Sequence, residues 1–164
     1  MAIPYEVNYL NRQVDMELLQ SIAQPVEIQR VHANFIFGPA KIVTGIQKAV
    51  QRYALLLLTE IGDVHFDATQ GVSFLRPILG GNIQNRGRFQ NLFAVANAEV
   101  RTQLNSEDAK IDTYGSIPDD ERIVNSQLLD FDINFETATV TLRVAITTAA
   151  GDSFTFIVPV TVPR

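Results

Sequence analysis

The last third of the chain contains three successive stretches in which apolar and polar residues alternate with a period of two. They cover residues 128–135, 140–147 and 154–162. Strict alternation is typical of strands that place one face on a core and the other in water. The apolar positions expected to face the core are Leu129, Phe131, Ile133, Phe135, Val140, Leu142, Val144, Ile146, Phe154, Phe156, Val158, Val160 and Val162. The links between the stretches are short, so we expect a three-stranded antiparallel meander.

The last strand of this meander is expected to form an edge of the sheet. Pro159 and Pro163 lie within or just after it. Proline is confined to sheet edges because it has no N–H to donate to the ladder. An exposed edge is either blocked against aggregation or used to accept a strand from a partner. The sequence leaves both interpretations open.

Two amphipathic helices are predicted ahead of the meander. After Gly38-Pro39, apolar residues recur at spacings of three and four from Ile42 to a leucine-rich end at residues 55–58, before Gly62. The second helix is expected over about residues 86–103, with Asn85 or Gly87 near its start. Between the helices, residues 67–85 are rich in glycine and are expected to form a long ordered loop.

The N-terminal part has no firm period. Residues 15–22 are compatible with a short helix ending before Pro25, and residues 31–37 alternate like a strand. The predicted fold class is therefore α+β, with two main helices packed on a small antiparallel sheet and a C-terminal three-stranded meander. Residues 1–38 are expected to form an N-terminal extension with one strand, and residues 39–164 a single α+β domain.

Composition narrows the possible functions. The chain has 164 residues, no cysteine and a net charge of -5, which rules out thiol chemistry and disulfides and argues against a nucleic-acid partner. The longest apolar run, residues 53–58, is too short to span a bilayer, so no membrane partner is expected. The N-terminus lacks the pattern of a signal peptide, so we expect the chain to stay where it is made.

Residues with catalytic or metal-binding chemistry are sparse. The histidines His32 and His65 cannot form a three-ligand zinc site without carboxylates, and Asp130 and Asp132 lack the dense spacing of a calcium loop. A glycosidase would need two carboxylates across a sugar cleft, and the neighbouring candidates are Glu60, Asp63 and Asp67. Nothing in their surroundings singles out a general acid. We expect no enzyme, no catalytic or metal-binding residues and no cofactor.

The ordered set of these features resembles a protein family. The matching residues are Ile46, Leu55, Leu56, Leu57, Leu58, Thr59, Gly62, Gly71, Glu121, Arg122, Ile123 and the strands over roughly residues 128–162. They resemble the small baseplate wedge protein of contractile-tailed phages and related injection machines, the sheath initiator, once described as a tail lysozyme. That family has a Glu-Pro-Arg-Ile element, whereas here Glu121 is followed directly by Arg122. It also has an arginine shortly after Thr-x-x-Gly, where this chain has Val64 and His65.

The resemblance implies a structural subunit of the tail baseplate, located in the virion and made in the host cytoplasm. The implied partners are the larger baseplate wedge proteins, the tail sheath protein and the tail tube or hub proteins, with several copies, six expected, in a ring. Docking on the larger wedge proteins is expected through the helical part and the Glu121-Arg122 element, and sheath templating through the edge of the C-terminal sheet. The implied interface residues are Glu121, Arg122, Ile123, Phe154, Phe156, Val158 and Val160. The alternatives are a peptidoglycan-cleaving tail lysozyme and a generic adaptor module.

Overall fold

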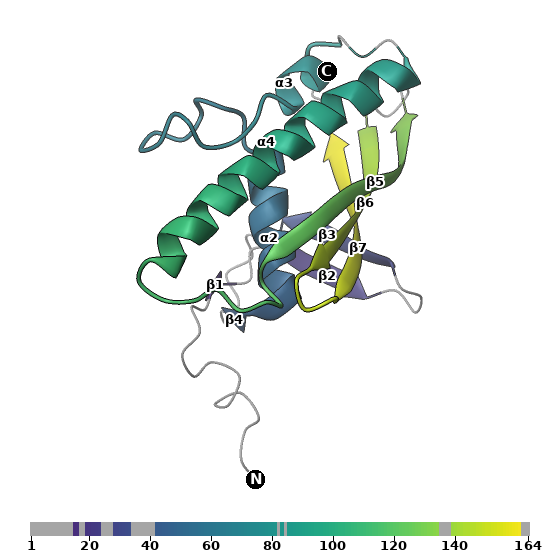
Figure 1. Cartoon of the computed structure of the whole chain (residues 1–164). Coiled ribbons are helices and arrows are strands. Elements are labelled where there is room, and N and C mark those ends of the chain that lie inside the picture. The colour runs from purple at the N-terminus through teal and green to yellow at the C-terminus, as the bar shows by residue number, and fades with distance from the viewer. Residues whose placement is uncertain are drawn as a thin grey trace.

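The structure is a computed structural model that describes residues 15–16, 19–23, 28–33, 42–81, 83, 85–134 and 139–161. The strands are β1 Asp15–Met16, β2 Leu19–Ala23, β3 Ile28–Ala33, β4 Ile42–Val43, β5 Ile123–Asn134, β6 Thr139–Thr148 and β7 Ser153–Thr161 (Figure 1). The helices are α2 Gly45–Leu58, α3 Leu75–Leu79 and α4 Arg86–Asp112. The fold class is α+β, as predicted.

A five-stranded sheet in the order β2-β3-β7-β6-β5 forms the centre of the fold. β5, β6 and β7 pair antiparallel, which confirms the predicted meander. β3 pairs with β7 in parallel through residues 28–30 and 155–157, and β2 pairs antiparallel with β3. The sheet is therefore mixed rather than purely antiparallel. The short strands β1 and β4 form a separate two-stranded sheet.

The prediction that the C-terminal strand forms a sheet edge is wrong. β7 has β6 on one side and β3 on the other. The parallel pairing with β3 ends at Ile157, ahead of Pro159. Because proline has no N–H to donate, it fits at a position where that pairing has already stopped. The outermost strands of the sheet are β2 and β5.

The N-terminal strands also differ from prediction. Residues 15–22 carry β1 and most of β2 rather than a helix, because pairing with β3 overrides a weak helical pattern. The strand predicted over residues 31–37 is observed as β3, and residues 34–37 lie outside the described part of the chain. Residues 1–38 thus contribute more than the one strand expected. β2 and β3 belong to the same sheet as the meander, not to a separate extension.

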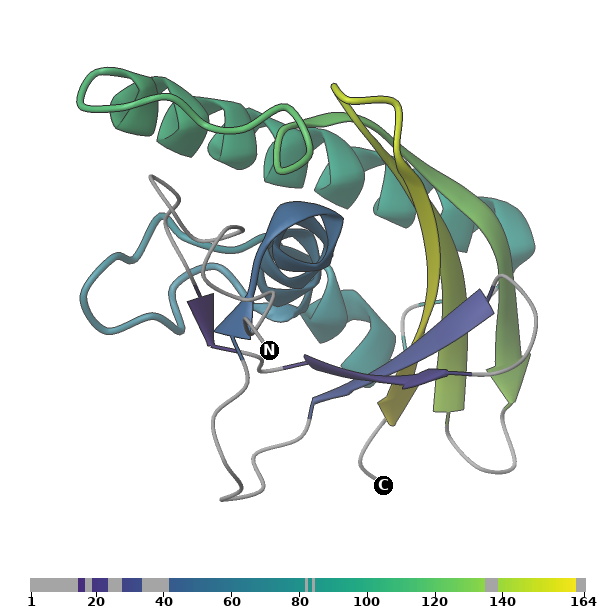
Figure 2. The ribbon, with the colours of Figure 1, turned by 90° about the horizontal axis from the view of Figure 1, so that it is seen from below.

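Helices α2 and α4 cover one face of the sheet, and the sheet curves around α2 (Figure 2). The core lies between them and contains Tyr53 edge-on to Phe156 and Phe89 stacked on Phe131, with ring centroids 6.0 and 4.3 Å apart. Fully burying an apolar side chain of this size contributes roughly 1.5–3 kcal/mol. The helix faces and strand faces predicted to be apolar supply most of this core.

Helix α4 begins where the sequence predicts and ends later. The Asn85 side chain accepts a hydrogen bond of 2.8 Å from the Arg88 amide, which caps the first turn. The helix continues past residue 103 because its buried face continues through Leu104 to Asp108. Asp108 accepts a hydrogen bond of 2.8 Å from Arg52 on α2, so the extra turns are held by a contact between the two helices.

Strand β5 contains a β-bulge that changes which residues face the core. Its register with β6 shifts between Leu128 and Asp130. A bulge adds one residue to one strand, so the alternation of faces is displaced beyond it. Ser126 before the bulge and Phe131 after it are both buried. Leu129 lies within the bulge and is 48% exposed, so its predicted place in the core is wrong.

The segment between α2 and α3 is a loop whose two ends are fastened together. The Val72 amide donates to the Thr59 carbonyl at 2.9 Å. The Gln103 side chain on α4 accepts from the Gly71 amide at 3.0 Å and donates to the Gly71 carbonyl at 2.6 Å. Gly71 has a φ of +92°, and a Cβ added there would lie 2.4 Å from the Thr59 carbonyl oxygen. Glycine is therefore required at this crossing.

We expect the Gly71→Ala substitution to destabilise the fold by more than the roughly 1–3 kcal/mol that its backbone conformation alone costs. Gly62→Ala is the matched control, because Gly62 has a φ of +90° and nothing within 4 Å of an added Cβ. Urea denaturation should give Gly71→Ala the lower free energy of unfolding. Equal values for the two variants would contradict a steric clash at the base of the loop.

Candidate functional site

The Glu121 carboxylate lies inside the fold. Glu121 is 2% exposed, and its Oε1 accepts a hydrogen bond of 3.2 Å from the Gly45 amide. Its Oε2 accepts a hydrogen bond of 2.9 Å from Lys48 Nζ. Gly45 is the first residue of α2, and the N-cap residue Thr44 makes no side-chain capping bond. Glu121 therefore supplies both an acceptor and a negative charge at the start of α2.

The neighbouring residues of this element also serve the chain itself. Arg122 donates to both carboxylate oxygens of Asp112, at 3.1 and 2.8 Å. This hydrogen bond raises the pKa of Arg122 and, with a bond from the Ile117 amide, lowers the pKa of Asp112. Ile123 is buried in the core. The prediction of Glu121 and Ile123 as interface residues is thus contradicted by their burial, and only Arg122 reaches the surface.

The predicted interface residues of the last strand face the core. Phe156, Val158 and Val160 are buried, and Phe154 is partly buried against them. The backbone edge that was expected to accept a sheath strand is paired with β3 over residues 155–157. These four side chains therefore do not form a docking surface, and that prediction is corrected.

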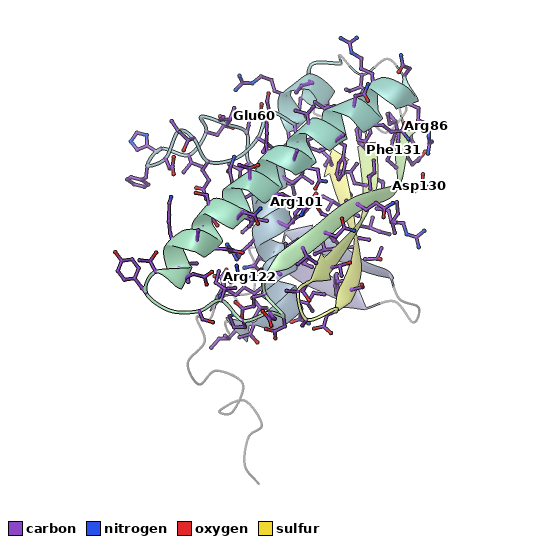
Figure 3. All side chains as sticks on the ribbon, viewed as in Figure 1. Glu60, Arg86, Arg101, Arg122, Asp130 and Phe131 are labelled. Carbon is purple, nitrogen blue, oxygen red and sulfur yellow. The ribbon has the colours of Figure 1, made fainter. Side chains whose placement is uncertain are left out.

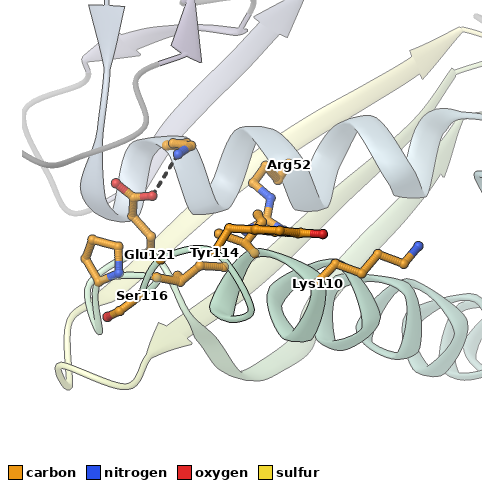
Figure 4. Close-up of a pocket in the computed structure, with 10 residues that line it drawn as sticks. Arg52, Lys110, Tyr114, Ser116 and Glu121 are labelled. Carbon is orange, nitrogen blue, oxygen red and sulfur yellow. Dashed lines mark hydrogen bonds and ion pairs between the residues drawn. The ribbon is translucent and has the colours of Figure 1, made fainter.

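A pocket of about 550 Å³ lies beside Glu121, between α2, the end of α4 and the turn that follows it (Figure 4). Lys48, Arg52 and Lys110 contribute basic groups to its lining. Lys48 is paired with Glu121 at 2.9 Å, as the dashed line shows.

The positive charge of Arg52 is likewise paired with carboxylates of the same chain. It contacts Glu107 at 3.0 Å and Asp108 at 2.8 Å. Burial alone would lower the pKa of Arg52, but the hydrogen bonds to these two carboxylates outweigh it and raise the pKa. Two of the three cations of the pocket are therefore neutralised by the fold, and they join its elements instead of marking an anion site.

Glu60 holds the start of α3. Its Oε2 accepts from the amides of Leu75 and Arg76 at 3.1 and 3.0 Å, and its Oε1 accepts from Ser73 Oγ at 3.1 Å. These are the amides that the first turn of a helix leaves unpaired. The carboxylate is buried with both oxygens engaged. This geometry gives Glu60 a structural role in the loop-to-helix connection.

Asp67 shapes the loop rather than a sugar site. It accepts bonds from the Thr69 hydroxyl at 2.6 Å and the Thr69 amide at 2.9 Å. These bonds lower the pKa of Asp67. A glycosidase acid needs a raised pKa, so the surroundings of Asp67 do not favour the lysozyme alternative.

The outer edge of β5 is covered by side chains of α4. Asn97 Nδ2 donates to the Ser126 carbonyl at 3.2 Å, and Arg101 donates to the Val124 carbonyl at 2.7 Å. Figure 3 shows Arg101 projecting from α4. Neither Asn97 nor Arg101 stands out in the sequence as a candidate functional residue. Their spacing of one helical turn is the signal that places them on the same face. They occupy backbone acceptors that a partner strand would need.

The later part of β5 is protected by charge. Asp130 accepts from the Phe131 amide and from Arg86, both at 2.8 Å. Arg86 also lies 4.4 Å from the centroid of the Phe131 ring (Figure 3). Charged side chains and bulges are devices that keep edge strands from pairing with other chains. β5 is therefore an unfavourable site for strand addition.

The other edge of the sheet is β2. Within the described part of the chain, β2 has a single neighbour, β3, which pairs with all five of its residues. On the edge of β2 that faces away from β3, the strand presents every other backbone N–H and C=O group. The sheet thus has one covered edge, β5, and one edge, β2, at its other end.

The described residues hold no group of three histidine or acidic side chains that could bind a metal ion. Over the same ranges, no helix has the length and apolar character needed to cross a membrane.

No protein-family model, curated protein or solved structure matches this chain. The family likeness therefore rests on the residues themselves.

We expect Glu121→Ala to destabilise the fold by about 3 kcal/mol or more, because it leaves a buried lysine without this carboxylate and an α2 amide without an acceptor. Adding Lys48→Met in the same chain should recover part of the loss. Urea denaturation measures both. A cost below about 1 kcal/mol, as for an exposed ion pair, would contradict the structural role.

The pair between Asp112 and Arg122 predicts a dependence on pH. Because the folded chain lowers the pKa of Asp112, ionised Asp112 stabilises the fold above its unfolded pKa, and this contribution is lost as pH falls through the folded pKa. Asp112→Asn should therefore be less stable than the unchanged protein at pH 7 and equally stable in strong acid. Thermal unfolding across this range measures the difference, and a constant difference would contradict the pairing.

Proposed function

We propose that the protein is a structural subunit of a contractile phage tail baseplate. In this proposal it resides in the virion tail, docks on the larger wedge proteins around the tube and templates assembly of the tail sheath. It acts in several copies, with six in a ring as the resemblance implies. The proposal rests on the likeness to the sheath-initiator family.

The residues of that likeness have connected structural roles, which supports the proposal. Gly71 crosses Thr59 at the base of the loop after α2. Glu121 reaches back to the first turn of α2. Motif residues far apart in sequence thus fix the same helix at its two ends. Such shared contacts are expected if the motif residues together determine one arrangement of α2, the loop and the sheet.

The observation that carries the mechanism is the order of the sheet, which leaves β2 as the edge for strand addition. β7 lies inside the sheet, paired with β6 on one side and with β3 over residues 155–157 on the other, and the β5 edge is occupied by α4 and Asp130. In strand addition, backbone hydrogen bonds provide affinity that tolerates many sequences. We therefore assign sheath templating to β2 instead of the C-terminal strand.

Templating follows from an edge that is already ordered. A sheath segment that joins an existing sheet loses only its own conformational freedom, since the edge has no further ordering cost. The first ring of sheath subunits would then start on the baseplate in preference to free solution.

The test mixes the purified protein with the sheath protein of its own phage, using the variants Gln20→Pro and Ser21→Pro. Neighbouring N–H groups of a strand point to opposite sides, so one proline removes a bond to β3 and the other removes an outward donor. Thermal unfolding identifies the outward variant, which should keep the stability of the unchanged protein. We expect that variant to bind sheath about tenfold more weakly.

Equal binding by the outward variant would overturn the β2 assignment. No binding by the unchanged protein, at concentrations where sheath assembles, would overturn the proposed function itself. Truncation before Phe154 is unsuitable as a control, because Phe156 is fully buried and its loss would unfold the core.

A further inference from the structure

The loop between α2 and α3 presents an aromatic side chain to solvent. Phe66 is 97% exposed and contacts the ring of His65 edge-on, with centroids 5.6 Å apart. Ile61 in the same loop is also exposed. Isolated exposed apolar residues are common, but a large aromatic side chain that projects fully from a loop can serve as a contact site.

This loop has a defined shape. Its base is held by the Gly71 crossing and by Gln103 of α4. Within it, the Asp63 amide donates to the Glu60 carbonyl at 3.1 Å, and the Gln70 amide donates to the Asp67 carbonyl at 3.1 Å. An anchor on such a loop loses little conformational entropy when it binds. Phe66 is therefore well placed to serve as a docking anchor.

The same molecule carries an apolar groove with a basic group. An open surface groove of about 600 Å³ lies along α4 beside α3 and is lined by Pro77, Ile83, Arg88, Asn91, Leu92 and Val95. Val95 is 59% exposed. The Arg88 side chain is exposed and forms no ion pair within the described residues. A groove of this size readily accepts an aromatic side chain.

Loop and groove are complementary in charge as well as in apolar character. Asp63 and Asp67 flank Phe66 in sequence, so the loop is acidic and aromatic, whereas the groove carries Arg88. In the pocket beside Glu121, Lys48 and Arg52 are already paired with carboxylates, which leaves Lys110 as the third basic group of its lining. The α3–α4 groove combines one exposed arginine with the apolar residues Pro77, Ile83, Leu92 and Val95, and it therefore matches the loop in both charge and apolar character.

The two surfaces lie apart on the molecule. The loop projects at the end where α4 finishes (Figures 1 and 2), whereas the α4 residues that line the groove belong to the first half of that helix. A contact between different patches of identical chains is heterologous, and it builds a ring or a filament according to its rotation.

We propose that copies of this chain associate head to tail, with Phe66 of one copy seated in the α3–α4 groove of the next and Asp63 facing Arg88. This contact does not depend on the proposed sheath function. It uses neither β2 nor the residues predicted from the family likeness.

Sedimentation velocity of the full chain tests the contact at concentrations up to about 1 mM, a range that includes weak interfaces. We expect Phe66→Ala and Val95→Asp each to weaken association about tenfold or more. Tyr114→Ala is the matched control, because Tyr114 is 95% exposed and lies outside the groove. A monomeric protein over the whole range, or Phe66→Ala associating like the unchanged chain, would overturn the proposal.

Mixing two variants tests the head-to-tail geometry. Phe66→Ala retains a groove, and Val95→Asp retains a loop, so together they can form one intact contact. We expect each variant alone to be monomeric and the mixture to form a heterodimer that grows no further. Larger assemblies in the mixture, or no heterodimer, would contradict a loop-in-groove contact.

Charge reversal tests the polar part of the contact. Asp63→Arg and Arg88→Asp should each weaken association, while both changes in one chain should restore it, because every contact then pairs the exchanged charges. Neither residue contributes a side chain to the core, so folding should be unchanged. If the double variant associates no better than the two single variants, Arg88 is not part of the contact.

Discussion

One buried carboxylate connects the two halves of this fold. Glu121 sits in the turn before β5 and binds the first amide of α2 and the ammonium group of Lys48. The position of α2 on the sheet is thereby set from its beginning, while the Gly71 crossing sets the loop that leaves its end. A charge removed from water in this way is favourable only when its partners are in place. The helix, the sheet and the loop therefore have to be ordered together.

The alternation of polar and apolar residues predicted well which side chains of the meander face the core. It did not predict which other strand pairs with the meander. β6 follows the pattern without interruption, and Val140, Leu142, Val144 and Ile146 are all buried. Leu129 departs from it because a bulge adds a residue, and bulges leave no clear mark in a polar and apolar pattern. The position of β7 inside the sheet was not predictable, because its second neighbour comes from the other end of the chain.

The prediction that Glu121 lies at an interface is wrong for a related reason. A charged run such as residues 119–122 looks like surface when its partners are unknown, and those of Glu121 lie on α2. The helix pattern identified the apolar face of α4, but not that Asn97, Arg101 and Gln103 bind backbone groups of β5 and the loop. Such contacts depend on which elements meet in space. Asn85, in contrast, was predictable because capping is local.

The parallel pairing of β3 with β7 joins residues 28–30 to residues 155–157. During synthesis the chain emerges from its N-terminus, so the residues of β2 and β3 are made before the strand that anchors them. Contacts over such sequence separations form slowly and late in folding. The hairpin gains its place in the sheet only after the final strand has been made. A chain cut short by incomplete translation would therefore lack the anchored β2 edge.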